Sequence, residues 1–128
     1  MDIIMHAESD LTLITNIVQA YFMGTYEGKE DLLRMAFHSD AHVSGNINGQ
    51  YHDWTLNDFI SRVTCIPTAS SKGEKYDKEI LSIDISNEAA LAKARVRVNG
   101  LTFIDYITLL KIDGRWIIRN KSFTTLTS

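Results

Sequence analysis

The dipeptide Asp113-Gly114 lies between two long apolar runs, and it constrains the fold of this chain more than any other feature. A two-residue type I′ turn needs positive φ at both central positions, and Asp-Gly is one of the pairs that most readily adopt it. The stretch from Leu101 to Thr124 is therefore predicted to be a β-hairpin. A two-residue turn also fixes the pairing of its strands, with Thr108 opposite Arg119.

Side chains alternate between the two faces of a strand, so this pairing divides the hairpin into two surfaces. One surface is largely apolar, yet it carries Asp105 and Asn120, and we expect it to face the core. The other surface mixes aromatic side chains with long cations and is expected to stay open. The residues assigned to the core surface are Phe103, Asp105, Ile107, Leu109, Trp116, Ile118 and Asn120, and those assigned to the open surface include Tyr106, Ile117, Arg119, Lys121 and Phe123.

The N-terminal half shows the apolar spacing of amphipathic helices. Helices are predicted over Ser9–Glu27, Lys29–Ala36 and Thr55–Cys65. The segment between the second and third helices is rich in turn residues, with Asn48-Gly49 at its centre, and suits two short extended pieces around a tight turn.

The C-terminal half instead alternates in the manner of β-strands, over Tyr76–Ser86 and Ala89–Asn99 before the hairpin. Helices first and strands last, joined by short connections, predict an α+β fold with an antiparallel meander of about four long strands. The length of the chain suits one domain, residues 1–128.

Composition excludes several classes of function. The net charge of −3 argues against a nucleic-acid binder that works by general electrostatics. The single cysteine, Cys65, leaves no intrachain disulfide and no four-cysteine zinc site, which is typical of a reducing compartment. We find neither a signal-peptide pattern nor an apolar run long enough to span a membrane, so the chain is expected to be cytoplasmic and without a membrane partner.

The predicted sheet has two faces, and three helices can cover only one of them. The other face mixes arginines with aromatic and aliphatic side chains, which is more typical of a partner surface than of a solvated one. We therefore expect a homodimer that forms through the open sheet face. A solvated antiparallel face is the alternative.

The order of the predicted elements, with the FHSDA segment at 37–41, resembles the nuclear-transport-factor-2-like superfamily over nearly the whole chain. More narrowly, the chain resembles the putative lumazine-binding family, close to the SnoaL-like polyketide cyclases. Ser39 stands where proline is common in that family. The most specific part is the closing pattern, Asp105-Tyr106, Leu110-Lys111, Asp113-Gly114, Trp116, Ile118, Asn120-Lys121 and Phe123.

This resemblance implies a cone-shaped, cystatin-like fold, in which three N-terminal helices pack on a strongly curved antiparallel sheet and leave a pocket at the wide end. It also implies a dimer through the sheet. Members of the superfamily include ketosteroid isomerases, scytalone dehydratase, cyclases and scaffolds that bind peptides, so the fold alone does not select one function.

Three polar residues are candidates for catalysis. Asp105 sits among apolar neighbours, and desolvation would raise its pKa into the range of a general base. Asn120 could orient a ligand or stabilise an oxyanion, and His38 could bond a ligand or carry a proton. Each also has a structural interpretation, as a hydrogen-bonded carboxylate, a buried amide or a satisfied histidine.

Aromatic residues are the candidates for ligand contacts. Trp116 and Phe103 lie on the core surface, where they could form the wall of a pocket for a planar ligand. The other candidates are Tyr21 and Phe22 on the first helix and Tyr51 and Trp54 before the third, each of which has a place in core or rim as its alternative.

A metal site is not expected, although His38, Asp40 and His42 fall at alternate positions and could share one face of a strand. No cofactor is expected either.

The leading hypothesis is a pocket that binds a small apolar or aromatic molecule. One alternative is an isomerase, dehydratase or cyclase that uses Asp105 as general base, and the other is a dimeric protein-interaction scaffold. A cavity lined by Asp105 and Trp116 would favour binding or catalysis over a scaffold. A second titratable group within hydrogen-bond reach of Asp105 would favour the enzyme.

Overall fold

The structure of the chain is a computed structural model that describes residues 9–65 and 67–126. Residues 1–8, to which the expected lack of a signal peptide refers, lie outside the described residues. The elements are helices α1 (Asp10–Glu27), α2 (Glu30–Ala36) and α3 (Leu56–Val63) and strands β1 (His42–Ile47), β2 (Gln50–Thr55), β3 (Lys78–Ser86), β4 (Ala89–Val98), β5 (Leu101–Ile112) and β6 (Arg115–Thr125).

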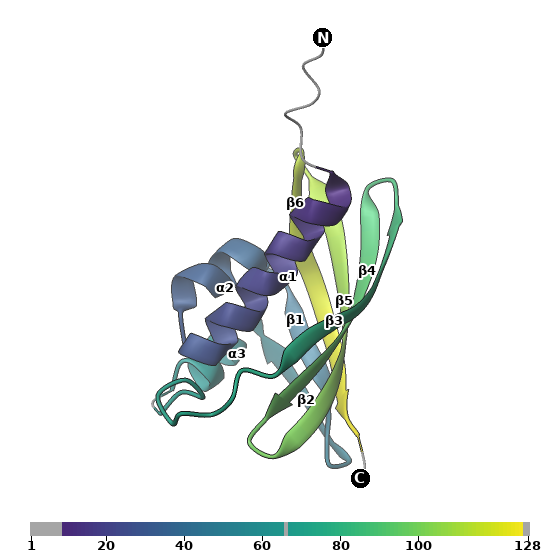
Figure 1. Cartoon of the computed structure of the whole chain (residues 1–128). Coiled ribbons are helices and arrows are strands. Elements are labelled where there is room, and N and C mark those ends of the chain that lie inside the picture. The colour runs from purple at the N-terminus through teal and green to yellow at the C-terminus, as the bar shows by residue number, and fades with distance from the viewer. Residues whose placement is uncertain (1–8, 66, 127–128) are drawn as a thin grey trace.

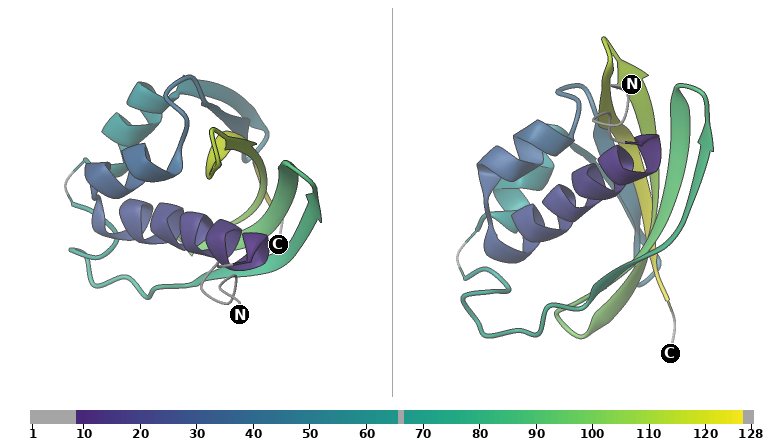
Figure 2. Two further views of the ribbon diagram at one scale, coloured as in Figure 1. Left: turned by 90° about the horizontal axis from the view of Figure 1, so that it is seen from above. Right: turned by 45° about the horizontal axis from the view of Figure 1, so that its top comes forward.

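The strands form one sheet in the order β2-β1-β6-β5-β4-β3. All neighbours are antiparallel except β1 and β6, which run parallel. The sheet curves strongly, and the helices lie on its concave side (Figures 1 and 2). The α+β prediction is confirmed, with two corrections. The sheet has six strands rather than about four, and β1 and β2 come before α3, so the three helices do not all precede the sheet.

Local capping explains where α1 begins and ends and where α3 begins. The Ser9 hydroxyl accepts a hydrogen bond from the backbone N–H of Thr12 at the start of α1. Gly28 ends that helix in the left-handed conformation, with φ at 68°. Thr55 caps α3 in the same way as Ser9, by accepting from the N–H of Asp58.

The core fills the space between the helices and the concave face of the sheet. The buried side chains of β4 are Ala90, Ala92, Ala94 and Val96, which are all small. The largest fully buried side chains elsewhere include Trp116, Phe22, Phe37, Ile14, Leu33, Ile107, Leu109 and Ile118.

The tight turn of the β5–β6 hairpin is confirmed, because Asp113 and Gly114 both have positive φ, at 51° and 76°. The predicted pairing holds only near the turn. A β-bulge interrupts the ladder between Leu109 opposite Ile118 and Thr108 opposite Asn120, which leaves Arg119 as the extra residue. The predicted pairing of Thr108 with Arg119 is therefore wrong.

The bulge reverses the alternation of β6 beyond Arg119. Lys121 and Phe123 were expected on the open face, and both are buried on the concave side. Asn120 was expected beside Asp105, and it is exposed instead. Asp105 itself lies on the concave side as predicted, with 1% of its surface exposed.

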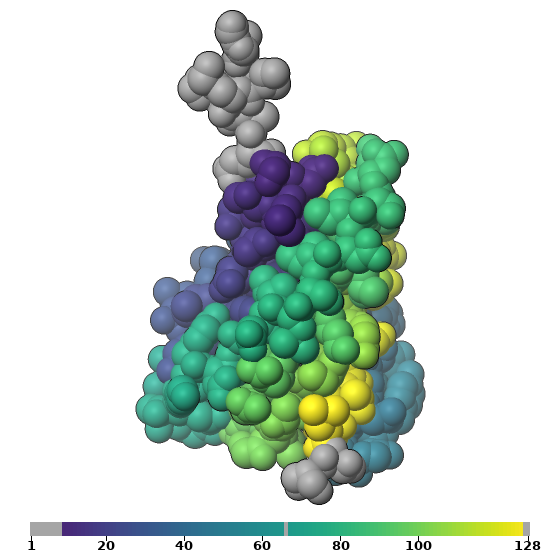
Figure 3. All heavy atoms as spheres, turned by 45° about the vertical axis from the view of Figure 1, so that its right-hand side comes forward, coloured from purple at the N-terminus to yellow at the C-terminus, as the bar shows by residue number. Residues whose placement is uncertain are grey.

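The convex face of the sheet has no described helix over it, and Figure 3 shows β3, β4 and β5 at the surface. Two of its arginines pair with carboxylates, Arg95 with Glu79 of β3 and Arg97 with Asp77 just before that strand. Partly exposed large apolar residues on these strands are Leu81, Leu91, Tyr106, Leu110 and Ile112. None of the described helices has the length and apolar character needed to cross a membrane.

Candidate functional site

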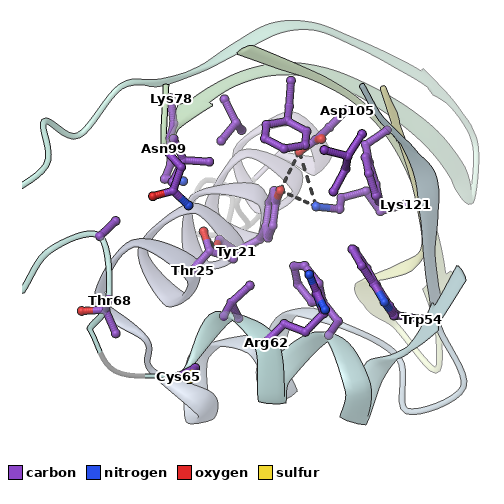
Figure 4. Close-up of a pocket in the computed structure, with 18 of the residues that line it drawn as sticks. Tyr21, Thr25, Trp54, Arg62, Cys65, Thr68, Lys78, Asn99, Asp105 and Lys121 are labelled. Carbon is purple, nitrogen blue, oxygen red and sulfur yellow. Dashed lines mark hydrogen bonds and ion pairs between the residues drawn. The ribbon is translucent and has the colours of Figure 1, made fainter. Parts of the chain in front are cut away.

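A cavity of about 270 Å³ opens between the second half of α1, helix α3, the segment 67–72 and the concave face of the sheet (Figure 4). Its walls are largely apolar. The apolar and aromatic lining residues are Ile47, Trp54, Phe59, Val63, Val96, Val98, Phe103 and Phe123. This volume lies just below the roughly 300–1,000 Å³ typical of ligand pockets, so the cavity suits a small molecule.

Three polar side chains form the floor of the cavity. The Lys121 ammonium donates a hydrogen bond to the Tyr21 hydroxyl over 2.6 Å. That hydroxyl donates in turn to Oδ2 of Asp105, also over 2.6 Å. The ammonium and the same carboxylate oxygen are 3.7 Å apart, which makes a buried ion pair. Figure 4 shows the three groups joined by these contacts.

The environment of this network shifts the pKa values of two of its members. Burial, followed by the charge of Asp105, raises the pKa of the Tyr21 hydroxyl well above its ordinary value, so Tyr21 keeps its proton. Burial lowers the pKa of Lys121, and Asp105 opposes that shift. The ammonium also lies 4.4 Å from the Tyr21 ring centroid and 4.7 Å from that of Phe59, as a cation over two aromatic faces.

Aromatic stacking builds the wall of the cavity on the α3 side. Trp54 stacks on Phe123, with ring centroids 5.7 Å apart and planes 16° from parallel. On its other flank Trp54 stacks on His52, and the Arg62 guanidinium lies 4.4 Å from the Trp54 ring centroid. These three neighbours fix the orientation of the Trp54 ring, so a ligand on this side of the cavity would meet Trp54 together with Arg62 and Phe123.

The charge of the lining differs in sign from the charge of the chain. Arg62, Lys72, Lys78 and Lys121 line the cavity with one carboxylate, Asp105, which pairs with Lys121, while Lys72 pairs with Glu74 beside the lining. The chain as a whole carries −3. Cations gathered at one hollow raise the local potential there and favour a ligand with negative charge or an electronegative oxygen.

Two β-bulges turn lysines into the cavity. The bulge at Arg119 directs Lys121 inward, as described above. A second bulge lies in β3, where Ile80 pairs with Ala94 and Ser82 with Lys93, so that Leu81 is the extra residue. Lys78 then pairs with the buried Val96 and lines the cavity. Bulges that re-aim a side chain occur often beside functional sites.

The structure brings four of the candidate residues together at the cavity and places five elsewhere. Asp105, Tyr21, Trp54 and Phe103 line it. Phe22 is packed in the core. Trp116 is buried away from the cavity, where its indole N–H donates to Oδ1 of Asp10 over 2.9 Å. Tyr51, on edge strand β2, is 68% exposed.

The remaining two candidates have local hydrogen-bond roles. The Asn120 side chain accepts a hydrogen bond from the backbone N–H of His42. His38 accepts from the N–H of Asp40 through Nδ1 and lies on a shallow depression beside the β5–β6 turn.

Within residues 9–65 and 67–126, no group of His, Cys, Asp and Glu side chains could hold a metal ion. The His42 ring instead pairs with the Asp53 carboxylate, 2.9 Å away.

Sequence reasoning missed Lys121 and Lys78 as site residues. One signal for Lys121 was available, because Trp116 and Ile118 are even-numbered and Phe123 is odd-numbered. All three can face the core only if one residue between Ile118 and Phe123 breaks the alternation.

The family model described as putative lumazine-binding matches residues 9–124 of the chain. A curated protein called aldolase FrzH, from a Cladobotryum species, is 24% identical over 125 residues, which are 94% of this chain and 93% of that protein.

Two solved structures of nuclear-transport-factor-2-like proteins of unknown function are similar in fold. The protein from Methylobacillus flagellatus is 26% identical, with a TM-score of 0.78, over 94% of this chain and 97% of that one. The protein from Shewanella baltica is 23% identical, with a TM-score of 0.80, over 93% of this chain and 95% of that one. The family expected from the sequence is confirmed, and the expected α+β fold holds with the two corrections given above.

Proposed function

The chain belongs to the putative lumazine-binding family of nuclear-transport-factor-2-like proteins, and from this premise we propose that it binds a small, largely apolar or aromatic molecule in the cavity. The observation that carries the proposal is the Lys121–Tyr21–Asp105 network at the floor of an otherwise apolar hollow. An apolar pocket with a few convergent polar groups is the usual form of a ligand site.

Stability alone does not account for the network. Replacing a buried ion pair by apolar residues of similar volume is often neutral or stabilising, so a buried pair is weak evidence for a structural role. Here the pair borders a cavity, where its polar groups can meet a ligand. We propose that a carbonyl or carboxylate oxygen of the ligand lies at this floor, near Lys121 and Tyr21, while the apolar body of the ligand lies among the aromatic side chains of the lining.

Binding of 2-naphthoate, a bicyclic aromatic carboxylate, tests this proposal by calorimetry. In the variant Val98→Phe the new ring occupies the cavity, and we expect the affinity to fall at least tenfold, about 1.4 kcal/mol. Ala89→Phe is the matched control, because Ala89 is exposed at the start of the same strand and does not line the cavity. This control variant should bind as the wild type does.

Two further measurements accompany this test. Lumazine serves as a second bicyclic probe, and its affinity relative to 2-naphthoate tests whether the family description has chemical meaning for this chain. Mass spectrometry of small molecules extracted from the purified protein asks which compounds it retains. Equal affinity of 2-naphthoate for the Val98→Phe variant and the wild type would contradict the proposed site.

A second candidate function, an enzyme acting beside a carbonyl group, is favoured by one contact. The Tyr21 hydroxyl lies 2.6 Å from Asp105, which places a second titratable group within hydrogen-bond reach of the carboxylate. In this reaction Asp105 would remove a proton from the carbon next to the carbonyl, while the Lys121 ammonium stabilises the enolate oxygen and Tyr21 holds both groups in place. A curated relative is called an aldolase, which agrees with chemistry of this class.

Exchange of hydrogen for deuterium tests this candidate with 2-tetralone, an apolar bicyclic ketone with exchangeable α-hydrogens. We expect the chain to accelerate exchange over buffer, and Tyr21→Phe to slow it at least tenfold while the ketone still binds. If exchange is no faster than in buffer, the enzymatic function is rejected and the binding function still stands.

We also propose that the convex sheet face forms a homodimer contact. The partly exposed apolar residues of β4 and β5 support this, among them Leu91, Tyr106 and Leu110. Sedimentation equilibrium of the purified chain measures the mass in solution and decides between dimer and monomer. An interaction scaffold is less well supported, because a cavity opens beside the packed core.

A further inference from the structure

We propose that Lys78 is a nucleophilic amine of the cavity, which forms a protonated Schiff base with an aldehyde or ketone carrying an apolar body and a carboxylate. The inference rests on the proposed binding function and adds to it the chemical class of the ligand. Neither acid–base catalysis by Asp105 nor the floor network requires Lys78.

The position of Lys78 in the fold is the first support. It is the first residue of β3, and the bulge at Leu81 turns its side chain to the concave face, opposite Val96. Without that extra residue, the alternation that places Ile83 and Ile85 inward would direct Lys78 to the convex side. In Figure 4 Lys78 lies beside Asn99 at the side of the cavity, across from Trp54.

The lack of a partner is the second support. Within the described part of the chain, the Lys78 ammonium has no hydrogen bond and no ion pair. Lys121, by contrast, is held by Tyr21 and Asp105, and its amine is not free to attack a ligand. Lys78 is also partly open to the cavity, whereas Lys121 is only 5% exposed.

The protonation state of Lys78 suits this role. Burial, followed by the positive charge of Lys121, lowers its pKa to about 8, against a partial opposing effect of Asp105 and Glu74. At pH 7.5 about a quarter of Lys78 is then neutral, roughly two-hundredfold more than for an ordinary lysine. A desolvated lysine beside a second cation is a recognised form of activated amine.

The reaction balances without a further reactant. The neutral amine adds to the carbonyl carbon, the carbonyl oxygen takes up a proton, and the resulting hydroxyl leaves as water with a second proton. In sum, the ammonium and the carbonyl compound give an iminium ion and one water, and charge is conserved. Arg62, a further cation of the lining, favours a carboxylate on the same ligand.

Reductive trapping with 4-carboxybenzaldehyde and cyanoborohydride tests the inference, because reduction converts the iminium ion into a stable secondary amine. Peptide mass spectrometry then locates the labelled lysine. We expect Lys78 to be labelled at least tenfold faster than the exposed Lys75, and Val98→Phe to slow labelling at Lys78 but not at Lys75. Lys78→Met should abolish the fast phase, and Lys75→Met should leave it unchanged.

The outcomes separate this inference from the proposed function. If 2-naphthoate binds and labelling is no faster at Lys78 than at Lys75, or falls on Lys121, the Schiff base is wrong and the binding pocket stands. If 2-naphthoate does not bind, the proposed function fails whatever lysine is labelled. Lys78→Arg retains the positive charge, so loss of fast labelling in this folded variant shows that the amine itself reacts.

Discussion

Replacing Asp105 with asparagine is expected to lower the free energy of unfolding by about 3–5 kcal/mol, the usual cost of removing one partner from a buried ion pair. The Lys121 ammonium would remain at the floor of the cavity with only the Tyr21 hydroxyl as a partner. Urea denaturation at pH 7 measures the effect. The matched control is Asp84→Asn, an exposed carboxylate of β3, whose removal should change stability by less than about 0.5 kcal/mol.

The loss in Asp105→Asn should depend on pH in a direction fixed by Lys121. The folded-state pKa of Lys121 is already below its ordinary value of 10.5, and removing the carboxylate lowers it further. The unfolded chain then binds the proton more tightly than the folded chain, so stability rises with pH between the folded-state pKa and about 10.5. The penalty of the variant should therefore shrink from pH 7 towards pH 10.

A second substitution tests whether the unpaired Lys121 ammonium causes the lower free energy of unfolding. The double variant Asp105→Asn/Lys121→Met carries no buried charge at the floor, and we expect it to be at least about 2 kcal/mol more stable than Asp105→Asn alone. A single variant that loses under about 1 kcal/mol, or a loss equal at pH 7 and pH 10, would mean that the pair is not desolvated as described.

Replacing Gly45 with alanine is expected to destabilise the chain by about 3 kcal/mol or more, at or beyond the upper end of typical overpacking. Gly45 pairs with Phe123 where the parallel strands β1 and β6 meet. An added Cβ would overlap the backbone carbonyl oxygen of Phe123 and lie 2.8 Å from Cδ1 of its ring. Backbone cannot move aside as a flexible side chain can, so the pairing of the two strands must give way.

Thermal and urea unfolding measure the cost of Gly45→Ala, with Asn46→Ala as its neighbouring control on the exposed side of β1. Because Phe123 lines the cavity and stacks on Trp54, the glycine variant should also bind 2-naphthoate more weakly. A Gly45→Ala protein as stable as the wild type would show that β1 and β6 lie farther apart than in this structure.

The sequence predicted the elements whose signals are local. Asp113-Gly114 needs only its own backbone preference to form the turn, and Ser9 and Thr55 cap helices through hydrogen bonds three residues away. The covered face of β4 followed from strict alternation of small apolar residues, because that strand has no bulge.

The site was harder to predict because it depends on interruptions of that alternation. A bulge inserts one extra residue into one strand, which shifts the pairing of the residues beyond it by one position. Its place depends on how the two strands twist against each other, and the sequence of one strand alone does not show this. The bulge in β6 moved Lys121 from the surface expected for it to the cavity, and the bulge in β3 turned Lys78, for which no role was predicted, to the same cavity. Lysine is also among the residue types that are least often buried, so neither lysine was an obvious candidate for the interior.

The floor of the cavity also joins residues far apart in the chain. Tyr21 is 84 positions from Asp105 and 100 from Lys121, so the network forms only when α1 packs on the completed sheet. Sequence reasoning identified Tyr21 and Asp105 separately, as a ligand contact and a general base, and did not connect them.

The most direct test of the central claim uses the two tryptophans of the chain, which differ in their relation to the cavity. Trp54 lines it, whereas Trp116 is buried elsewhere and bonds to Asp10. Fluorotryptophan labelling gives one fluorine NMR signal for each, assigned by Trp54→Phe and Trp116→Phe. Saturating 2-naphthoate should shift the Trp54 signal and leave that of Trp116 in place. A bound ligand that shifts only Trp116, or neither signal, would contradict the pocket described here.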